Sequence, residues 1–111
     1  MSPSKPVRRI TIADIARMYE EGEKFATITA YDFPTARIVD EAGIPLILVG
    51  DSLGMVMLGY DTTVRVNIDE MLHHTRAVAR GAKHALVVGD MPFLTYGVST
   101  EESVEHAGRF L

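Results

Sequence analysis

Three aspartates in this sequence could act together on one ligand, because each stands just after an apolar run typical of a β-strand. They are Asp32, Asp51 and Asp90. The carboxyl ends of parallel strands lie on one side of a sheet, about 4.8 Å from strand to strand, so we expect these side chains to be close in space. Lys24 and Lys83 precede their strands and belong to the opposite end. Carboxylate oxygens without a neighbouring lysine favour a hard ion, Mg²⁺ first and Mn²⁺ as an alternative.

A simpler interpretation competes with metal binding at each aspartate. Asp32 stands two residues before Pro34, which favours a helix cap for its side chain. After the other two aspartates, the next helix caps are predicted at Asn67 and Ser99, so capping does not account for them. The glycine before each of these two lets the backbone approach a ligand closely. For them the residue pattern leaves a shared metal role and a turn role open.

Ser52 extends this group, because it offers a hydroxyl and a backbone N–H on which an anionic ligand could dock. A turn role is its plainer interpretation. No histidine is expected at this edge, since His73 and His74 fall in the middle of a predicted helix and His84 precedes its strand. Zinc is therefore disfavoured. Cysteine is absent from the sequence, which excludes disulfides, thiolate zinc sites and cysteine nucleophiles.

The elements that would position these side chains alternate between strand and helix. Residues 1–10 are expected to form a flexible leader with little to bury, and a helix is predicted over 11–22, opened by Thr11. Residues 25–111 then hold three strand–helix units. Their strands are predicted at 25–31, 46–49 and 85–88.

The connecting segments complete this pattern. A helix that starts near Pro34 follows the first strand, and a long irregular stretch is predicted over 52–66. Asn67 and Glu70 have the spacing of a capping box for the next helix, and Ser99 opens another. Such alternation predicts a parallel sheet built with right-handed crossovers.

Composition places the chain among globular proteins with one core. It has 111 residues, 47% of them hydrophobic and 23% charged, and a formal net charge of −4. A modest acidic excess argues against a protein that coats nucleic acid or anionic lipid. We find no signal-peptide pattern and no run of roughly 20 apolar residues, so a cytoplasmic location is expected.

The chain reads as the opening portion of a larger barrel or sheet. Three strands are few for a parallel architecture, and the last helical pattern reaches Leu111 without a capping signal. A purely structural fragment is a further interpretation, in which the unpaired strand edges predict self-association.

Four motifs give the sequence a specific resemblance. They are TAYD at 29–32, LVGDSLGM at 48–55, GYDTT at 59–63 and DMPF at 90–93. In this order and spacing they resemble the ketopantoate hydroxymethyltransferase family, over nearly all of the chain. The resemblance implies a (β/α)₈ TIM barrel, of which this α/β chain would be the N-terminal portion, with a leading helix that closes the amino end of the barrel.

The same resemblance implies an activity and a set of site residues. The family transfers a hydroxymethyl group from 5,10-methylenetetrahydrofolate to 3-methyl-2-oxobutanoate, giving 2-dehydropantoate in pantothenate biosynthesis. It implies Mg²⁺ ligation by Asp51 and Asp90, 2-oxo acid binding by Asp51, Ser52 and Asp90, and a homo-oligomer. The family's general base lies beyond Leu111, so we expect the chain alone to be inactive.

Two other classes of protein compete with this interpretation. Related Mg²⁺-dependent barrels that act on 2-oxo acids, such as phosphoenolpyruvate mutase and isocitrate lyase, share an acidic site at the strand ends. A receiver-like signalling domain also carries acidic residues and Mg²⁺ there. It needs about five strand–helix units, however, and has no place for the long stretch over 52–66.

Overall fold

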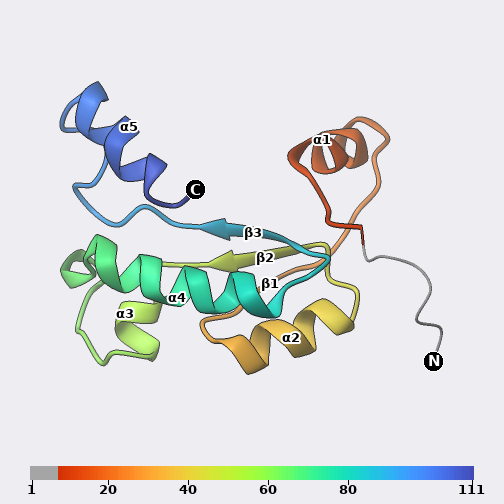
Figure 1. Cartoon of the computed structure of the whole chain (residues 1–111), viewed down its shortest axis with the longest axis horizontal. Coiled ribbons are helices and arrows are strands. Elements are labelled where there is room, and N and C mark those ends of the chain that lie inside the picture. The colour runs from red at the N-terminus through yellow and green to blue at the C-terminus, as the bar shows by residue number, and fades with distance from the viewer. Residues whose placement is uncertain (1–7) are drawn as a thin grey trace.

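The computed structural model describes residues 8–111, which form a three-stranded parallel sheet with helices around it (Figure 1). In chain order the elements are α1 (Ile12–Glu20), β1 (Thr27–Thr29), α2 (Phe33–Glu41), β2 (Leu46–Val49), α3 (Leu53–Val56), the 3₁₀ helix η1 (Thr63–Arg65), α4 (Ile68–Gly81), β3 (Leu86–Gly89) and α5 (Thr100–Gly108). The predicted α/β alternation is confirmed. Residues 1–7 of the predicted leader lie outside the described residues.

The strands are neighbours in the order in which they occur along the chain, β1-β2-β3. In the register of the sheet, Ile28 lies opposite Ile47, which in turn lies opposite Val87. A receiver-like domain would place its first strand between the second and the third, so this order excludes that alternative. A sheet in chain order is consistent with part of a TIM barrel.

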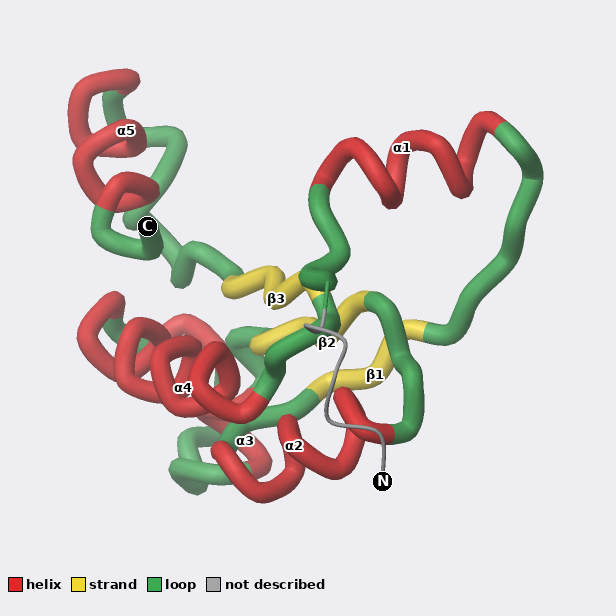
Figure 2. Tube along the Cα trace, turned by 45° about the vertical axis from the view of Figure 1, so that its right-hand side comes forward, coloured by secondary structure: helices red, strands yellow, loops and turns green. Residues whose placement is uncertain are grey.

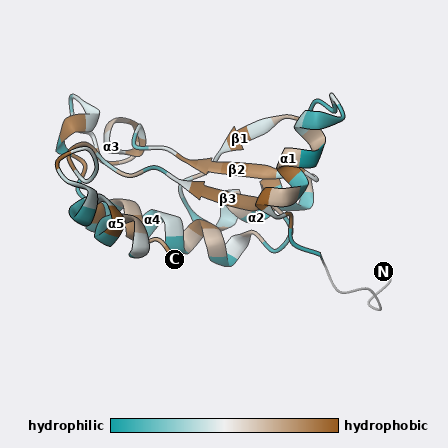
Figure 3. Cartoon of the chain, turned by 90° about the horizontal axis from the view of Figure 1, so that it is seen from above, coloured by the Kyte–Doolittle hydropathy of each residue, from teal (hydrophilic) through white to brown (hydrophobic). Residues whose placement is uncertain are grey.

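Helices α2 and α4 lie side by side against one face of the sheet (Figures 1 and 2). Alternation along β2 explains this packing, because Ile47 and Val49 are fully buried whereas Leu46 and Leu48 on the other face are only half-buried. The apolar character of β2 and β3 stands out against the mixed helix surfaces (Figure 3). The main core consists of Ala30, Ala36, Val39, Ile47, Val49, Leu53, Val66, Met71, Val78, Ala82 and Ala85.

Helix α1 begins as predicted at Thr11, whose hydroxyl accepts a hydrogen bond from the Asp14 N–H while the Asp14 carboxylate accepts one from the Thr11 N–H. This capping box satisfies two backbone donors of the first turn. The described end of the leader departs from expectation. Ile10 is buried, and its N–H donates to the carbonyl oxygen of His84 across 2.7 Å. Residues 8–10 are therefore docked at the amino end of β3.

The segment 52–66 is more regular than predicted. It contains α3 and η1, and the Tyr60 N–H donates to the Gly54 carbonyl across 2.8 Å. Val66 is buried in the core. The short helices have no long apolar period, so the sequence pattern alone did not reveal them.

Strand boundaries follow pairing more than composition. The predicted first strand over 25–31 contains β1, which covers Thr27 to Thr29. It begins at Thr27 because β2 offers partners only from Leu46 onward. Strand β2 matches its predicted bounds, and β3 begins one residue later than predicted. Within residues 8–111, no helix combines the length and apolar character that crossing a membrane would need.

Candidate metal and substrate site

Asp51 and Asp90 meet at the carboxyl ends of β2 and β3. The sheet register places Val49 opposite Gly89, so the next residues leave the two strands side by side. The Asp90 N–H continues the ladder by donating to the Val49 carbonyl across 3.0 Å. The Asp51 N–H donates to Oδ2 of Asp90, also across 3.0 Å. The structure thus brings together the two aspartates that the sequence analysis selected.

The electrostatics of this pair favour a bound cation. Burial raises the pKa of the Asp51 carboxyl, and repulsion from the Asp90 carboxylate raises it further. A divalent ion between two such groups would offset their repulsion. Two carboxylates are oxygen donors of the kind that Mg²⁺ and Mn²⁺ prefer, so the residues present fit the implied ion. Residues 8–111 contain no group of three or more acidic or histidine side chains that could hold a metal, so this pair supplies part of a coordination shell.

Ser52 lies next to this pair and makes a contact that its turn interpretation did not anticipate. It immediately precedes α3, but its side chain makes no capping hydrogen bond to that helix. Its Oγ instead lies 2.9 Å from the Tyr31 hydroxyl. A Cβ placed on Gly50 would lie 3.3 Å from Ser52 Oγ and 3.7 Å from Asp90 Oδ2. Gly50 therefore lets the serine hydroxyl and the Asp90 carboxylate pack close to the backbone between β2 and α3.

His74 reaches the same edge from α4. Its Nδ1 lies 2.7 Å from the carbonyl oxygen of Tyr31, and because a carbonyl only accepts, Nδ1 is the donor. The prediction that no histidine lies near a strand end is therefore wrong. A position in the middle of a helix does not show how far the side chain reaches once α4 packs on the sheet.

Asp32 has a structural role at the start of α2. Its Oδ1 accepts a hydrogen bond from the Thr35 N–H across 2.8 Å, which caps α2. This backbone donor holds the pKa of the Asp32 carboxyl below its ordinary value. The simpler interpretation of Asp32 as a cap is confirmed.

Gly89 has a packing role that the sequence analysis did not foresee. A Cβ there would lie 2.9 Å from Oγ1 of Thr75 and 3.1 Å from Cδ1 of Phe110. The glycine is therefore needed for the close approach of α4 and the segment after α5. Close approach of this backbone to a ligand stays a separate prediction.

The GYDTT motif supports the start of α4. The Tyr60 hydroxyl donates to Oε2 of Glu70 across 2.7 Å, while Oε1 of Glu70 accepts from the Asn67 N–H. Asn67 and Glu70 form the predicted capping box. The hydrogen bond from the Tyr60 hydroxyl to Glu70 raises the pKa of the Tyr60 phenol.

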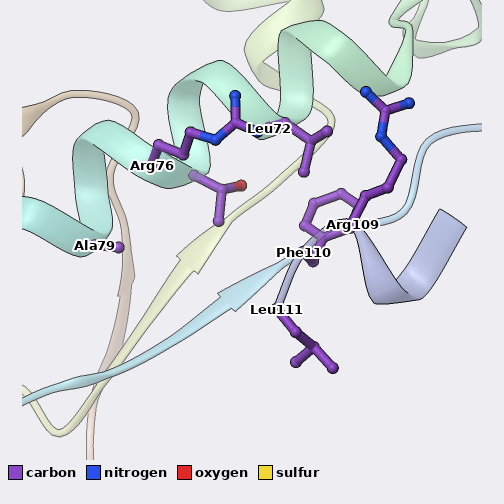
Figure 4. A pocket seen from close by; sticks show the side chains of 7 residues that line it. Leu72, Arg76, Ala79, Arg109, Phe110 and Leu111 are labelled. Carbon is purple, nitrogen blue, oxygen red and sulfur yellow. The ribbon is translucent and has the colours of Figure 1, made fainter.

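Two hollows lie away from the aspartate pair. One, of about 330 Å³, lies between α4 and the end of the chain (Figure 4). It is lined by Leu72, Thr75, Arg76, Ala79, Arg109, Phe110 and Leu111. The other, of about 260 Å³, lies beside Arg37 and Lys83, where the strands begin. Neither includes Asp51, Ser52 or Asp90, so the donor chemistry and not a cavity identifies the site.

Comparison with known proteins agrees with the motifs. The profile of the family described as ketopantoate hydroxymethyltransferase matches residues 9–111. The 3-methyl-2-oxobutanoate hydroxymethyltransferase of Chloroflexus aggregans (strain MD-66 / DSM 9485) is 61% identical over 103 residues, covering 93% of this chain and 37% of that protein.

More distant relatives carry the same name. The protein of Dehalococcoides mccartyi (strain CBDB1) is 56% identical over 103 residues, covering 93% of this chain and 37% of the relative. That of Syntrophus aciditrophicus (strain SB) is 53% identical over 111 residues, covering all of this chain and 41% of the relative. The chain thus spans between 37% and 41% of the length of these relatives.

Proposed function

Because the chain belongs to the ketopantoate hydroxymethyltransferase family, we propose that it supplies the metal and 2-oxo acid half of a hydroxymethyltransferase site. The reaction would transfer a one-carbon unit from 5,10-methylenetetrahydrofolate to 3-methyl-2-oxobutanoate, giving 2-dehydropantoate for pantothenate biosynthesis. The observation that carries this proposal is the hydrogen-bonded contact between Asp51 and Asp90 at the carboxyl ends of neighbouring strands.

Asp51 and Asp90 are the residues that would hold Mg²⁺. Bound there, the ion would act as a Lewis acid toward the keto oxygen and so favour loss of the C3 proton of the substrate. The chain's own groups orient the partners of this chemistry. The Asp51 N–H fixes the Asp90 carboxylate, and the Ser52 hydroxyl, held beside them, can donate to the substrate carboxylate.

The proposal also covers the general base and the fold of the complete enzyme. A base must lie within hydrogen-bond reach of the proton that it takes, and we propose that it comes from the portion of the relatives that this chain does not cover. The sheet in chain order supports a (β/α)₈ barrel for the complete enzyme. A homo-oligomer in the cytoplasm completes the proposal.

A chimera tests this function directly. The chain would replace the matching segment of the Chloroflexus aggregans relative, and formation of 2-dehydropantoate would be followed with 3-methyl-2-oxobutanoate, 5,10-methylenetetrahydrofolate and Mg²⁺. We expect turnover that stops when the folate is omitted. A folded chimera without this activity would overturn the proposal, and folate-independent conversion of a 2-oxo acid would point to the phosphoenolpyruvate mutase and isocitrate lyase type of barrel.

A further inference from the structure

We propose that Tyr31 is a positioning residue that directs the Ser52 hydroxyl toward the carboxylate of the substrate. This inference rests on the proposed function and assigns a role to a residue outside the metal-binding pair. Its basis is the contact of 2.9 Å between the Tyr31 hydroxyl and Ser52 Oγ. Tyr31 would act through Ser52 without itself touching the ligand.

Tyr31 is held in place at both its main chain and its side chain. The Ala30 N–H extends the sheet by donating to the Leu48 carbonyl across 3.1 Å, and His74 Nδ1 donates to the carbonyl of Tyr31 across 2.7 Å. The ring of Tyr31 is partly buried against the core. A phenol anchored in this way presents its hydroxyl at a defined position, so the bond to Ser52 constrains the serine more than the tyrosine.

Either hydroxyl can donate in this bond, but a bound carboxylate would require Tyr31 to be the donor. A serine hydroxyl has one hydrogen to donate, and a carboxylate ligand can only accept. Within residues 8–111, Tyr31 is the hydrogen-bond partner of the Ser52 hydroxyl. If Tyr31 donates to Ser52, the serine hydrogen is left for the ligand. If Tyr31 is lost, the serine hydroxyl rotates freely and must be ordered when the ligand binds.

The placement of Ser52 supports a ligand on its other side. Ser52 Oγ and Oδ2 of Asp90 are neighbours, because they lie 3.3 Å and 3.7 Å from the position that a Cβ on Gly50 would take. A 2-oxo acid has a carboxylate next to a keto oxygen, so one end can meet the hydroxyl while the other end lies near the acidic pair. The orientation of the hydroxyl therefore decides how well the carboxylate end is bound.

Ligand binding without turnover tests the role of Tyr31. The dissociation constant of 3-methyl-2-oxobutanoate would be measured calorimetrically with Mg²⁺, without folate, for the chimera and for its Tyr31→Phe, Ser52→Ala and double variants. We expect each single variant to weaken binding about 3- to 10-fold, the range for one hydrogen bond. The double variant should bind no more weakly than Ser52→Ala alone, because Tyr31 acts through Ser52.

Tyr60→Phe is the matched control. It removes a tyrosine hydroxyl that makes a comparable bond, to Glu70, and should leave the dissociation constant unchanged. Unchanged binding in Tyr31→Phe would overturn the role of Tyr31 but not the proposed function. The same holds if the effects of Tyr31→Phe and Ser52→Ala add in full. An unsubstituted chimera that binds no 2-oxo acid would count against the proposed function itself.

A second substitution covers the case in which Tyr31→Phe does not fold. 3-Fluorotyrosine at position 31 keeps the ring and makes its hydroxyl a stronger donor. We expect tighter binding of 3-methyl-2-oxobutanoate in this protein, and an unchanged or weaker affinity would contradict the assignment.

Discussion

The backbone of Asp51 orients the side chain of Asp90, through a hydrogen bond of 3.0 Å from the Asp51 N–H to Oδ2. One residue therefore provides both a carboxylate and the donor that fixes the second carboxylate. Asp90 thus has an oxygen that accepts this hydrogen bond and a negative charge that could hold a cation. A substitution can remove the charge while an accepting oxygen stays.

Asp90→Asn removes the charge but keeps an oxygen that can accept from the Asp51 N–H. We expect this variant of the chimera to fold and to lose Mn²⁺ affinity by at least the roughly 10- to 100-fold that removal of an outer-shell partner costs. Electron paramagnetic resonance of free Mn²⁺ measures the dissociation constant. Asp61→Asn, at an exposed aspartate, is the control, and equal affinities in both variants would rule out ligation by Asp90.

The raised pKa of Asp51 predicts a particular pH dependence of stability in the metal-free protein. Burial and the Asp90 charge raise this pKa above 3.8, so the folded state binds the proton more tightly than the unfolded state. The contribution of this carboxyl to stability is then fully present below pH 3.8 and is lost as pH rises through the folded value. With chelator present, the urea midpoint of Asp51→Asn minus that of the unsubstituted chimera should therefore increase from acid to neutral pH. A difference that shrinks over that range would contradict this prediction.

The 111-residue chain by itself is expected to give no 2-dehydropantoate above background. The side chains that meet at the strand ends are proposed to orient a 2-oxo acid, and the proposed base comes from outside this chain. The assay compares the chain with the chimera at equal molar concentration, and circular dichroism establishes that the chain is folded. Turnover by the chain alone would show that a base lies within it.

Local signals predicted the helices α1, α2, α4 and α5, whereas pairing sets where the strands begin. Thr11, Asp32, Asn67 and Ser99 each cap the helix that follows them, because capping depends on residues within one turn. Strand β1 begins two residues later than the predicted run over 25–31, because its first partner is Leu46, where β2 begins. That limit depends on another part of the chain and is not visible in the run itself.

The site shows the same division between local and distant causes. Asp51 and Asp90 could be predicted, because parallel strands bring residues just after their ends together. The contact of Tyr31 with Ser52 and that of His74 with Tyr31 could not. Both depend on side chains that reach across from other elements, and no periodicity in the sequence encodes that reach.

The hydrogen bonds of Asp40, which lies away from Asp51 and Asp90, are expected to stabilise the fold. Burial disfavours its charged form, but the backbone N–H groups of Ala85, Lys83 and His84 together lower the pKa of its carboxyl. These bonds, of 2.7 to 3.0 Å, attach the end of α2 to the start of β3.

Asp40→Asn should destabilise the chimera by about 1–3 kcal/mol in urea unfolding at neutral pH, because the acceptor loses its charge and the amide NH₂ group that replaces one oxygen cannot accept. The difference from the unsubstituted protein should diminish as pH falls through the lowered pKa, since the carboxylate contribution disappears there. Glu41→Gln, at the exposed neighbouring residue, should change the unfolding free energy little. A loss in Asp40→Asn that persists unchanged in acid would argue against the charge as its cause.

Gly89→Ala tests the packing role assigned to that glycine. The added methyl group would press against Thr75 Oγ1 at 2.9 Å and Phe110 Cδ1 at 3.1 Å, and overpacking of this kind costs about 1–3 kcal/mol. Oγ1 of Thr75 is buried without a hydrogen-bond partner in the described part of the chain, so Thr75→Ala removes the crowded atom at little cost. The double variant should therefore recover part of the stability lost in Gly89→Ala, as a thermal or urea unfolding cycle would reveal.

Gly108→Ala, where a Cβ meets nothing within 4 Å, is the control and should not destabilise. If Gly89→Ala is as stable as that control but weakens binding of the 2-oxo acid, the glycine serves the ligand after all, and the packing explanation is wrong.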